Sequence, residues 1–305
     1  MSLLPDAVLD GSWERPGRNP VFGAVAGLII CGGVYSTLGG TVSGIVAAFD
    51  ALRDPSWLSG RLLDILVEYY RRFQVTILVV TMVAQFAVFF ALAVALVRRW
   101  HSSRPFSYLA YARPAALELA LAAAGAVAIV PLAELLDRWS YVVLPPLREL
   151  AAGEATLLAV RAPWQAALVF GAVAVTPAVC EELLFRGWLQ GTLRRRLAPA
   201  PAIAVQAVLF SLFHMSPLSI VALAFVGLYL GWLFERTGTL YASMTAHGLY
   251  NATIIAIANL QPHWLADASG NFSPPVLAGS LAALAIVLAL IELRARQRSR
   301  SASAG

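Results

Sequence analysis

Ionisable and polar residues interrupt the apolar C-terminal half of the sequence at three places. The first is the segment 181–186, which reads Glu-Glu-Leu-Leu-Phe-Arg; the second is His214; the third is the segment 247–251, which begins with His and ends with Asn. An ionisable side chain in hydrocarbon is costly and usually faces a partner or a functional cavity. A carboxylate, imidazoles and a carboxamide can together activate a water and stabilise an oxyanion, which is the equipment for amide hydrolysis.

The spacing at the first place separates its two glutamates. Glu182 and Arg186 are four residues apart, so on a helix they form an acid–base pair one turn apart. Such pairing offsets much of the cost of burying either charge. Glu181 points about 100° away from its neighbour and is left over. A spare carboxylate in an apolar pocket suits a general base, while the alternative is that both glutamates only join helices.

Helical rise predicts that the other polar residues lie at a similar depth. Measured from the end of its apolar segment nearest the basic loops, Glu181 lies roughly 15–20 Å deep and His214 roughly 20 Å. His247 and Asn251 come out at roughly 10–18 Å. Each histidine alone is compatible with packing, but three antiparallel helices with polar residues at one level favour a shared site. Phe210, one turn before His214, either orients that imidazole or only packs.

A divalent metal is another use of these side chains. Glu181, His214 and His247 could hold zinc, which accepts carboxylate and imidazole ligands. The sequence contains no His-Glu-x-x-His pair, so it does not require zinc, and the cofactor stays open between zinc and none. Nearby serines and threonines form no nucleophile elbow and fit helix packing. Gly227 and Gly231 have the small-xxx-small spacing of closely packed helices.

Composition predicts the elements that carry these residues. Of the 305 residues, 59% are hydrophobic and 13% are charged, which is about half the charged share of a soluble domain. Since a hydrocarbon core of about 30 Å needs roughly 20 helical residues, we expect an all-α, polytopic transmembrane helical bundle of about eight spans. The expected spans are 20–49, 73–97, 114–136, 164–190, 200–216, 218–234, 240–260 and 274–292.

The segments between these spans lead to further expectations. The fifth and sixth spans are separated only by 215–217 and predict a tight helical hairpin. The charged stretch 50–72 is either an amphipathic interfacial helix or an ordinary loop. We expect three parts: 1–160 with an N-terminal cytoplasmic segment and three transmembrane helices, a core at 161–260, and 261–305 with the last helix and an Arg-rich cytoplasmic tail.

The distribution of arginine predicts the orientation of the bundle. The net charge is +5, and all 22 basic residues are arginine. The strongly basic segments are 98–113, 194–196 and 294–300, and all three fall on one side when eight spans are counted. Basic loops stay in the cytoplasm, so both termini are expected there. The residue bias suggests a bacterial inner membrane, and the placement of the arginines indicates membrane topology and no nucleic-acid partner.

The motif residues resemble the CPBP family of CAAX proteases and bacteriocin-processing enzymes, also called the ABI family. That family carries Glu-Glu-x-x-x-Arg, Phe-x-x-x-His and His-x-x-x-Asn or Asp on separate transmembrane helices. The corresponding residues here are Glu181, Glu182 and Arg186, then Phe210 and His214, then His247 and Asn251. The resemblance covers about residues 164–255, and the first three spans add no motif.

The resemblance implies an intramembrane endopeptidase that hydrolyses a peptide bond near the membrane, CAAX-type or bacteriocin-related. By that likeness Glu181 is the base, helped by His214, and His247 and Asn251 form the oxyanion site. The Glu182–Arg186 pair then holds the base in place. The expected partners are a peptide or protein substrate, lipidated or membrane-bound, and membrane lipids. The alternatives are a non-catalytic immunity or scaffold protein that binds a peptide in the same cavity and, with less support, a proton-coupled transporter.

Overall fold

The computed structural model describes residues 7–143, 153–262, 265 and 271–304, and within these ranges it contains helices and no strand. The α-helices are α1 (Pro20–Arg53), α2 (Leu62–Arg72), α3 (Gln74–Ala84), α4 (Ala93–Trp100), α5 (Pro105–Tyr108), α6 (Ala116–Val143), α8 (Pro163–Val169), α9 (Thr176–Glu182), α10 (Gly191–Leu193), α11 (Pro199–Phe213), α12 (Ile220–Thr237), α13 (Leu240–Leu260) and α14 (Pro274–Ala304). The 3₁₀-helical segments are η1 (Pro55–Leu58) and η4 (Thr156–Leu158), and the π-helical segments are η2 (Gln85–Leu92), η5 (Phe170–Val175) and η6 (Leu183–Gln190). The expected all-α class is confirmed.

Each of the expected apolar segments lies on one of these helices. Among the described residues, 6 helices are long and apolar enough to cross a membrane: Pro20–Arg53, Gln74–Trp100, Ala116–Ser140, Pro163–Leu193, Ile220–Thr237 and Pro274–Ser301. The second combines α3, η2 and α4, and the fourth combines α8, η5, α9, η6 and α10. α13 has 21 residues but is not among these 6 helices; it carries the polar residues of the third motif. The structure is thus consistent with a transmembrane bundle of about eight spans.

α11 is shorter than the span expected at 200–216. It has 15 residues, which at about 1.5 Å per residue extend roughly 22 Å, less than the hydrocarbon thickness of about 30 Å. The helix stops because Met215 adopts a φ of 49°, a left-handed conformation that cannot continue an α-helix. The helix therefore ends at His214, before it has covered that thickness.

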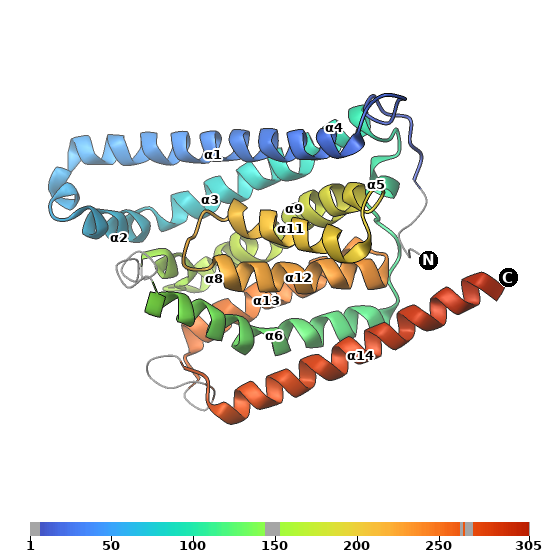
Figure 1. Cartoon of the computed structure of the whole chain (residues 1–305). Coiled ribbons are helices and arrows are strands. Elements are labelled where there is room, and N and C mark those ends of the chain that lie inside the picture. The colour runs from blue at the N-terminus through green and yellow to red at the C-terminus, as the bar shows by residue number, and fades with distance from the viewer. Residues whose placement is uncertain (1–6, 144–152, 263–264, 266–270, 305) are drawn as a thin grey trace.

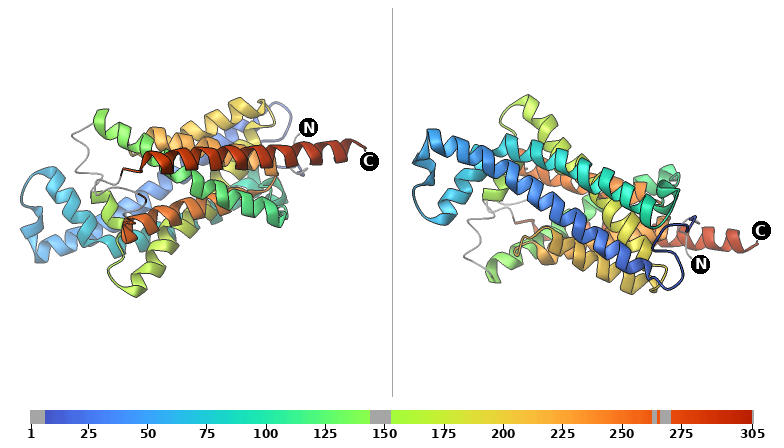
Figure 2. Two further views of the ribbon diagram at one scale, coloured as in Figure 1. Left: turned by 90° about the horizontal axis from the view of Figure 1, so that it is seen from below. Right: turned by 90° about the horizontal axis from the view of Figure 1, so that it is seen from above.

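Two of the buried apolar clusters hold the outer helices of the bundle to its centre. Figure 1 shows α1 and α14 along opposite edges of the molecule, and the views from below and above in Figure 2 agree. One cluster joins α1 to η6 and includes Leu28 and Trp188. The other joins α6, α12, α13 and α14 and includes Ile129, Leu230 and Ile291. The helices that carry the three motifs lie between these two edges.

The predicted basic loops lie at one end of the bundle, where Figure 1 also shows both termini. Arg194 pairs with Glu235 at the end of α12 at 2.7 Å. Arg298 of α14 pairs with Glu118 of α6 at 2.5 Å and donates to the main-chain oxygen of Arg236 at 2.7 Å. The ends of helices far apart in the sequence are thus joined by arginine side chains.

The segment before α1 packs against the same end. The main-chain N–H groups of Gly11 and Trp13 donate to the carbonyls of His101 and Trp100 at 3.1 and 2.8 Å. His101 is fully buried, and its Nδ1 lies 2.8 Å from the Glu14 carboxylate. Burial lowers the pKa of His101, and the neighbouring Glu14 carboxylate opposes that shift. This histidine therefore serves to attach the N-terminal segment.

The charged stretch 50–72 is helical. α2 has no buried residue, although apolar and charged side chains alternate at helical spacing along it. Arg72 at its end pairs with Asp50 at 2.7 Å and with Asp54 at 3.0 Å, which fastens α2 to the end of α1. Of the two alternatives for this stretch, the amphipathic helix is the one observed.

The glycines of α12 let this helix approach its neighbours closely, as their spacing predicts. A Cβ atom on Gly227 would lie 3.1 Å from the Ala207 Cα, and one on Gly231 would overlap the Gln206 side chain. The Gln206 Nε2 donates to the Gly227 carbonyl at 2.8 Å, and the Gln190 Nε2 donates to the Gly231 carbonyl at 2.9 Å. The close helix contact and the two hydrogen bonds therefore both depend on having glycine, which has no side chain, at positions 227 and 231.

Gly231→Leu should destabilise the protein by about 1–3 kcal/mol, because an overpacked contact forces the helices apart. The melting temperature in detergent measures this effect. Gly33→Leu on α1 is the control, since a Cβ there meets nothing within 4 Å. Equal melting temperatures for the two variants would contradict the close contact.

Candidate active site

A fully buried ion pair lies where the three motifs meet. Arg186 donates through Nη1 to the Glu182 Oε1 at 2.6 Å, and both side chains are fully enclosed. The Nη2 of Arg186 also donates to the main-chain oxygen of Gly227 at 3.3 Å, which joins η6 to α12. The pairing predicted from the four-residue spacing is confirmed. Without it, each buried charge would carry an uncompensated desolvation cost.

The same carboxylate oxygen also holds α13. His247 lies 3% exposed, and its Nδ1 donates to the Glu182 Oε1 at 2.8 Å. A carboxylate only accepts hydrogen bonds, so Nδ1 is the nitrogen that carries hydrogen and Nε2 is left for another partner. Glu182 thus connects Arg186 on its own helix with His247 on a different one, a link that the sequence did not indicate.

Phe210 packs against the arginine and the two imidazoles of this centre. Its ring centroid lies 4.4 Å from the Arg186 Cζ, a cation–π contact. It also meets the imidazoles of His214 and His247 edge-on, at centroid distances of 4.7 and 5.9 Å. Cation–π contacts shielded from water contribute about 2 kcal/mol. Phe210 therefore both encloses the arginine and fixes the planes of the two rings.

Glu181 is the carboxylate that the buried pair leaves over. Its Oε1 accepts a hydrogen bond from the Gln85 Nε2 at 3.3 Å. Its Oε2 has no hydrogen-bond partner within the described ranges and lies 3.8 Å from the His214 Nε2. The helix therefore gives the two glutamates the different environments that the sequence predicts: Glu182 is paired, and Glu181 is available.

The backbone sets the tautomer of His214. Its Nδ1 donates to the main-chain oxygen of Phe210 at 2.8 Å. A carbonyl oxygen only accepts hydrogen bonds, so Nδ1 bears the hydrogen and the Nε2 of the neutral ring is the basic nitrogen. That nitrogen is the one nearest Glu181. The early end of α11 thus presents an imidazole lone pair to the spare carboxylate.

One cavity of about 300 Å³ contains these groups. The motif residues that line it are Glu181, Phe210, His214, His247 and Asn251. Thr81 of α3, Gln85 of η2 and Tyr250 of α13 also contribute to its wall. Ligand pockets in proteins typically begin at about this volume. All four residues predicted to be catalytic therefore face one shared space.

Asn251 is fixed at one side of this cavity. Its Nδ2 donates to the main-chain oxygen of Val173 at 2.8 Å. Val173 belongs to the π-helical segment η5, whose wider turns alter the usual hydrogen-bonding pattern of the helix. A carboxamide has two N–H hydrogens, so Asn251 retains one for a molecule in the cavity.

Sequence reasoning missed the contribution of the second span. Gln85 is 4% exposed and touches Glu181, and Thr81 lies one turn before it on the same helix. The available signal was a glutamine within an apolar run, because polar residues at membrane depth tend to face the protein interior. No charged residue lies near Gln85 in the second span. The site was therefore predicted from the motifs of the C-terminal half alone.

The candidate zinc ligands do not form a three-ligand set. Among the residues described, no group of at least three His, Cys, Asp or Glu side chains is placed to hold a metal ion. His214 Nε2 and Glu181 Oε2 lie 3.8 Å apart, but His247, whose Nδ1 donates to Glu182, is not grouped with them as a third ligand. The side chains as arranged do not fit a tetrahedral zinc site, and we derive no step through a metal.

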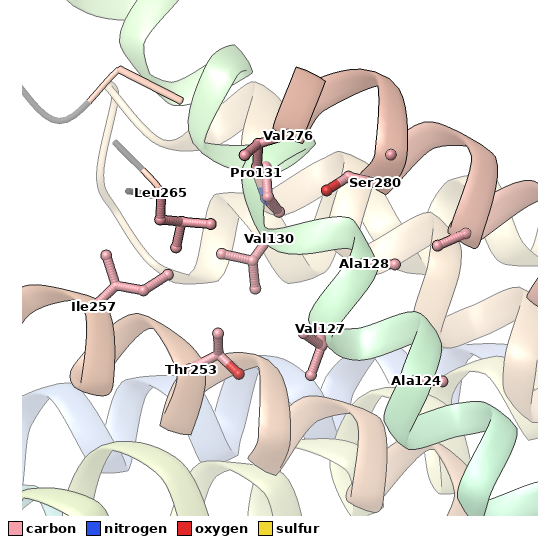
Figure 3. Close-up of a pocket in the computed structure, with 12 residues that line it drawn as sticks. Ala124, Val127, Ala128, Val130, Pro131, Thr253, Ile257, Leu265, Val276 and Ser280 are labelled. Atoms are coloured by element: carbon pink, nitrogen blue, oxygen red, sulfur yellow. The ribbon is translucent and has the colours of Figure 1, made fainter. Parts of the chain in front are cut away.

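A second, larger cavity of about 380 Å³ lies between α6, α13 and α14. Figure 3 shows its wall, which includes Val127, Val130, Ile257 and Leu265. Its polar side chains are the hydroxyls of Thr253 and Ser280, and it has no titratable residue in its lining. This apolar cavity therefore lacks the groups for hydrolysis.

Residues 163–253 match the sequence model of a family described as type II CAAX prenyl endopeptidase Rce1-like. We refer to residues 163–253 as the Rce1-like segment. The Rce1-like segment contains all of the motif residues on which the resemblance to CAAX proteases was based, and that resemblance is confirmed. Because the family is one of endopeptidases, the match supports a membrane-embedded peptidase. No curated protein and no solved structure was found to match the chain.

Arg186→Ala should lower the folded yield strongly, because it leaves Glu182 buried without its cation, a change that costs about 3–5 kcal/mol. Thermal stability in detergent and monodispersity on size exclusion measure this loss. Arg296→Ala is the matched control: Arg296 also pairs with a glutamate four residues away, Glu292, but is 68% exposed. Exposed pairs contribute less than about 1 kcal/mol, so similar behaviour of the two variants would contradict the role of the buried pair.

Proposed function

We propose that the protein is an intramembrane endopeptidase in which Glu181 and His214 activate a water for attack on a peptide bond. One observation carries the proposal: the Oε2 of Glu181 lies 3.8 Å from the Nε2 of His214, inside a cavity, without another hydrogen-bond partner within the described residues. Hydrogen bonds of about 2.8 Å from one water to each of these atoms are compatible with that separation. The Glu181 Oε2 and the His214 Nε2 each accept one hydrogen bond from this water.

The proposed reaction uses Glu181 first as a base and then as an acid. The carboxylate takes a proton from the water while the water oxygen forms a bond to the carbonyl carbon of the peptide. The tetrahedral intermediate collapses when Glu181 returns the proton to the amide nitrogen and the C–N bond breaks. The products are a carboxylic acid and an amine, and no covalent enzyme intermediate is involved. His214 holds the water through the lone pair on Nε2.

The oxyanion is assigned to Asn251 and His247, which line the same cavity. Asn251 retains one amide hydrogen beyond the bond to Val173. His247 can donate from Nε2 when both ring nitrogens carry hydrogen, while its Nδ1 stays on Glu182. Donors fixed in advance stabilise developing charge without reorganisation. In this scheme the Glu182–Arg186 pair keeps the helices at the distance that the reaction needs.

The proposed substrate class is based on the family match and on the membrane-crossing helices that surround the cavity. A peptide bond close to the membrane, in a lipidated or membrane-anchored protein, is compatible with the description of the family as CAAX prenyl endopeptidases; a bacteriocin-related peptide is the other substrate class. The gathering of basic residues at the end that carries both termini supports an orientation with that end in the cytoplasm of a bacterial inner membrane.

Glu181→Gln and His214→Ala should each lower cleavage at least about 100-fold, the usual scale of general acid–base catalysis, while both variants still insert and fold. A library of membrane-anchored peptides incubated with the purified protein, followed by mass spectrometry of the products, provides the measurement. Glu235→Gln changes a buried carboxylate that pairs with Arg194 outside the cavity, and should retain cleavage per folded molecule. Full cleavage by Glu181→Gln would contradict the proposal; loss of cleavage with retained peptide binding would agree with it and exclude a purely binding role.

Cleavage should persist when the purified protein is treated with a zinc chelator, because Glu181, His214 and His247 do not form a three-ligand set. The same peptide library before and after chelation, with metal content followed by mass spectrometry, tests this expectation. Loss of cleavage on chelation and its recovery on adding zinc would contradict it. A glutamate-based mechanism predicts unchanged product patterns under both conditions.

A further inference from the structure

We propose that Gln85 is a positioning residue for the Glu181 base, so that a helix outside the Rce1-like segment completes the active site. The inference rests on the proposed function. It concerns the part of the chain in which no motif is present, since Gln85 lies at the start of η2, within the second membrane-crossing helix. Three features of Gln85 support it: the hydrogen bond to Glu181, the burial of the side chain, and the position at the start of a π-helical segment.

The contact is made to the base itself. The Nε2 of Gln85 donates to the Oε1 of Glu181 at 3.3 Å, across the interface between η2 and α9. Within the described residues this is the hydrogen bond that the Glu181 side chain accepts, because its Oε2 has none. A bond to one carboxylate oxygen directs the other, and the other is the oxygen that lies 3.8 Å from His214. Gln85 thus holds the carboxylate in an orientation in which one oxygen faces the imidazole.

The burial of Gln85 is not explained by packing. The side chain is 4% exposed, lines the cavity, and has an Oε1 without a hydrogen-bond partner in the described part of the chain. A buried polar atom that lacks a partner is unfavourable, and an apolar side chain of the same length would avoid this penalty. The Oε1 is thus a buried acceptor without a partner, on a side chain that lines the cavity.

Gln74 on the same continuous helix provides the contrast. It is 3% exposed, and its Nε2 donates to the main-chain oxygens of Leu157 and Ala159 at 3.2 and 2.8 Å. Its Oε1 accepts from Arg161 at 3.1 Å. Every polar atom of that carboxamide is used to fasten a connecting segment. Gln74 is structural, whereas Gln85 has one polar atom without a partner in the described residues and gives the other to Glu181.

The backbone at Gln85 is also unusual. α3 changes to a π-helix at this residue, and two further π-helical segments, η5 and η6, flank the helix that carries Glu181. π-Helical turns are rare and occur frequently at functional sites, where they redirect side chains by inserting an extra residue into a turn. Both partners of the hydrogen bond therefore lie at or next to such turns.

The function of the contact is to restrict rotation of the carboxylate. The terminal torsion of a glutamate is broad and has only weak preferences of its own. With the donor present, one oxygen is fixed and the other stays toward the water held by His214. Misplacement of a reacting group by about 1 Å can lower a rate about 100-fold. A residue that positions the base should thus affect turnover more than substrate binding.

The first test compares Gln85→Met with Gln74→Met, since both remove a buried glutamine from one helix. With the fastest-cleaved peptide of the library, Gln85→Met should lower kcat roughly 10- to 100-fold with little change in KM. Gln74→Met should retain kcat per folded molecule and lose thermal stability. An unchanged kcat for Gln85→Met, or equal kcat losses in the two variants, would overturn the positioning role.

The second test uses Gln85→Glu, which has nearly the same shape. A carboxylate at this position repels Glu181 and cannot donate, whereas its protonated form can donate again. The ratio of its kcat to that of the unaltered protein should therefore rise as the pH is lowered. A ratio that stays constant with pH would contradict a hydrogen bond from this position to the base.

An infrared measurement separates failure of this inference from failure of the proposed function. The difference between the unaltered protein and Glu181→Gln assigns the carboxylate band of Glu181, independent of peptidase activity. Gln85→Met should shift that band and Gln74→Met should not; an unmoved band would overturn the inference. An unaltered protein that cleaves no peptide of the library would overturn the proposed function and the catalytic role of the contact together, even if the band shifts.

Discussion

The contact between Glu182 and Arg186 sets the conditions for everything around it. In a low-dielectric interior neither charge is tolerable alone, so the two side chains must meet, and each then takes a further partner from another helix: Arg186 the carbonyl of Gly227 on α12, and Glu182 the imidazole of His247 on α13. The cation is also covered by the ring of Phe210 from α11. Four helices are thus held at fixed distances by one pair of charges.

The same pair explains why Glu181 is available. Adjacent residues on a helix point in different directions, so the carboxylate next to the paired one is turned toward the cavity, where it lies near His214. A structural charge and a chemically available one therefore come from neighbouring positions of a single turn. The short α11 adds the imidazole from the other side, because the helix ends before it has crossed the layer.

The sequence was sufficient for the parts that depend on local geometry. The four-residue spacing predicted the Glu182–Arg186 pair, and helical rise predicted that His214, His247 and Asn251 would reach the level of Glu181; all four line one cavity. Tertiary contacts were not accessible in the same way. The bond from His247 to Glu182 and the bond from Gln85 to Glu181 each join two different helices, next to π-helical segments. Neither hydropathy nor residue spacing indicates which side chains of different helices meet.

The length of α11 has a consequence for the surrounding lipid. Its outer face carries Val205, Val208 and Leu212, which are exposed on the protein surface at helical spacing. A helix of roughly 22 Å beside hydrocarbon of about 30 Å creates a hydrophobic mismatch, and acyl chains next to a short span must compress or tilt. Thinning of the leaflet nearest Met215 would bring polar headgroups and water toward the level of His214. In that case the thickness of the host membrane would act on access to the cavity.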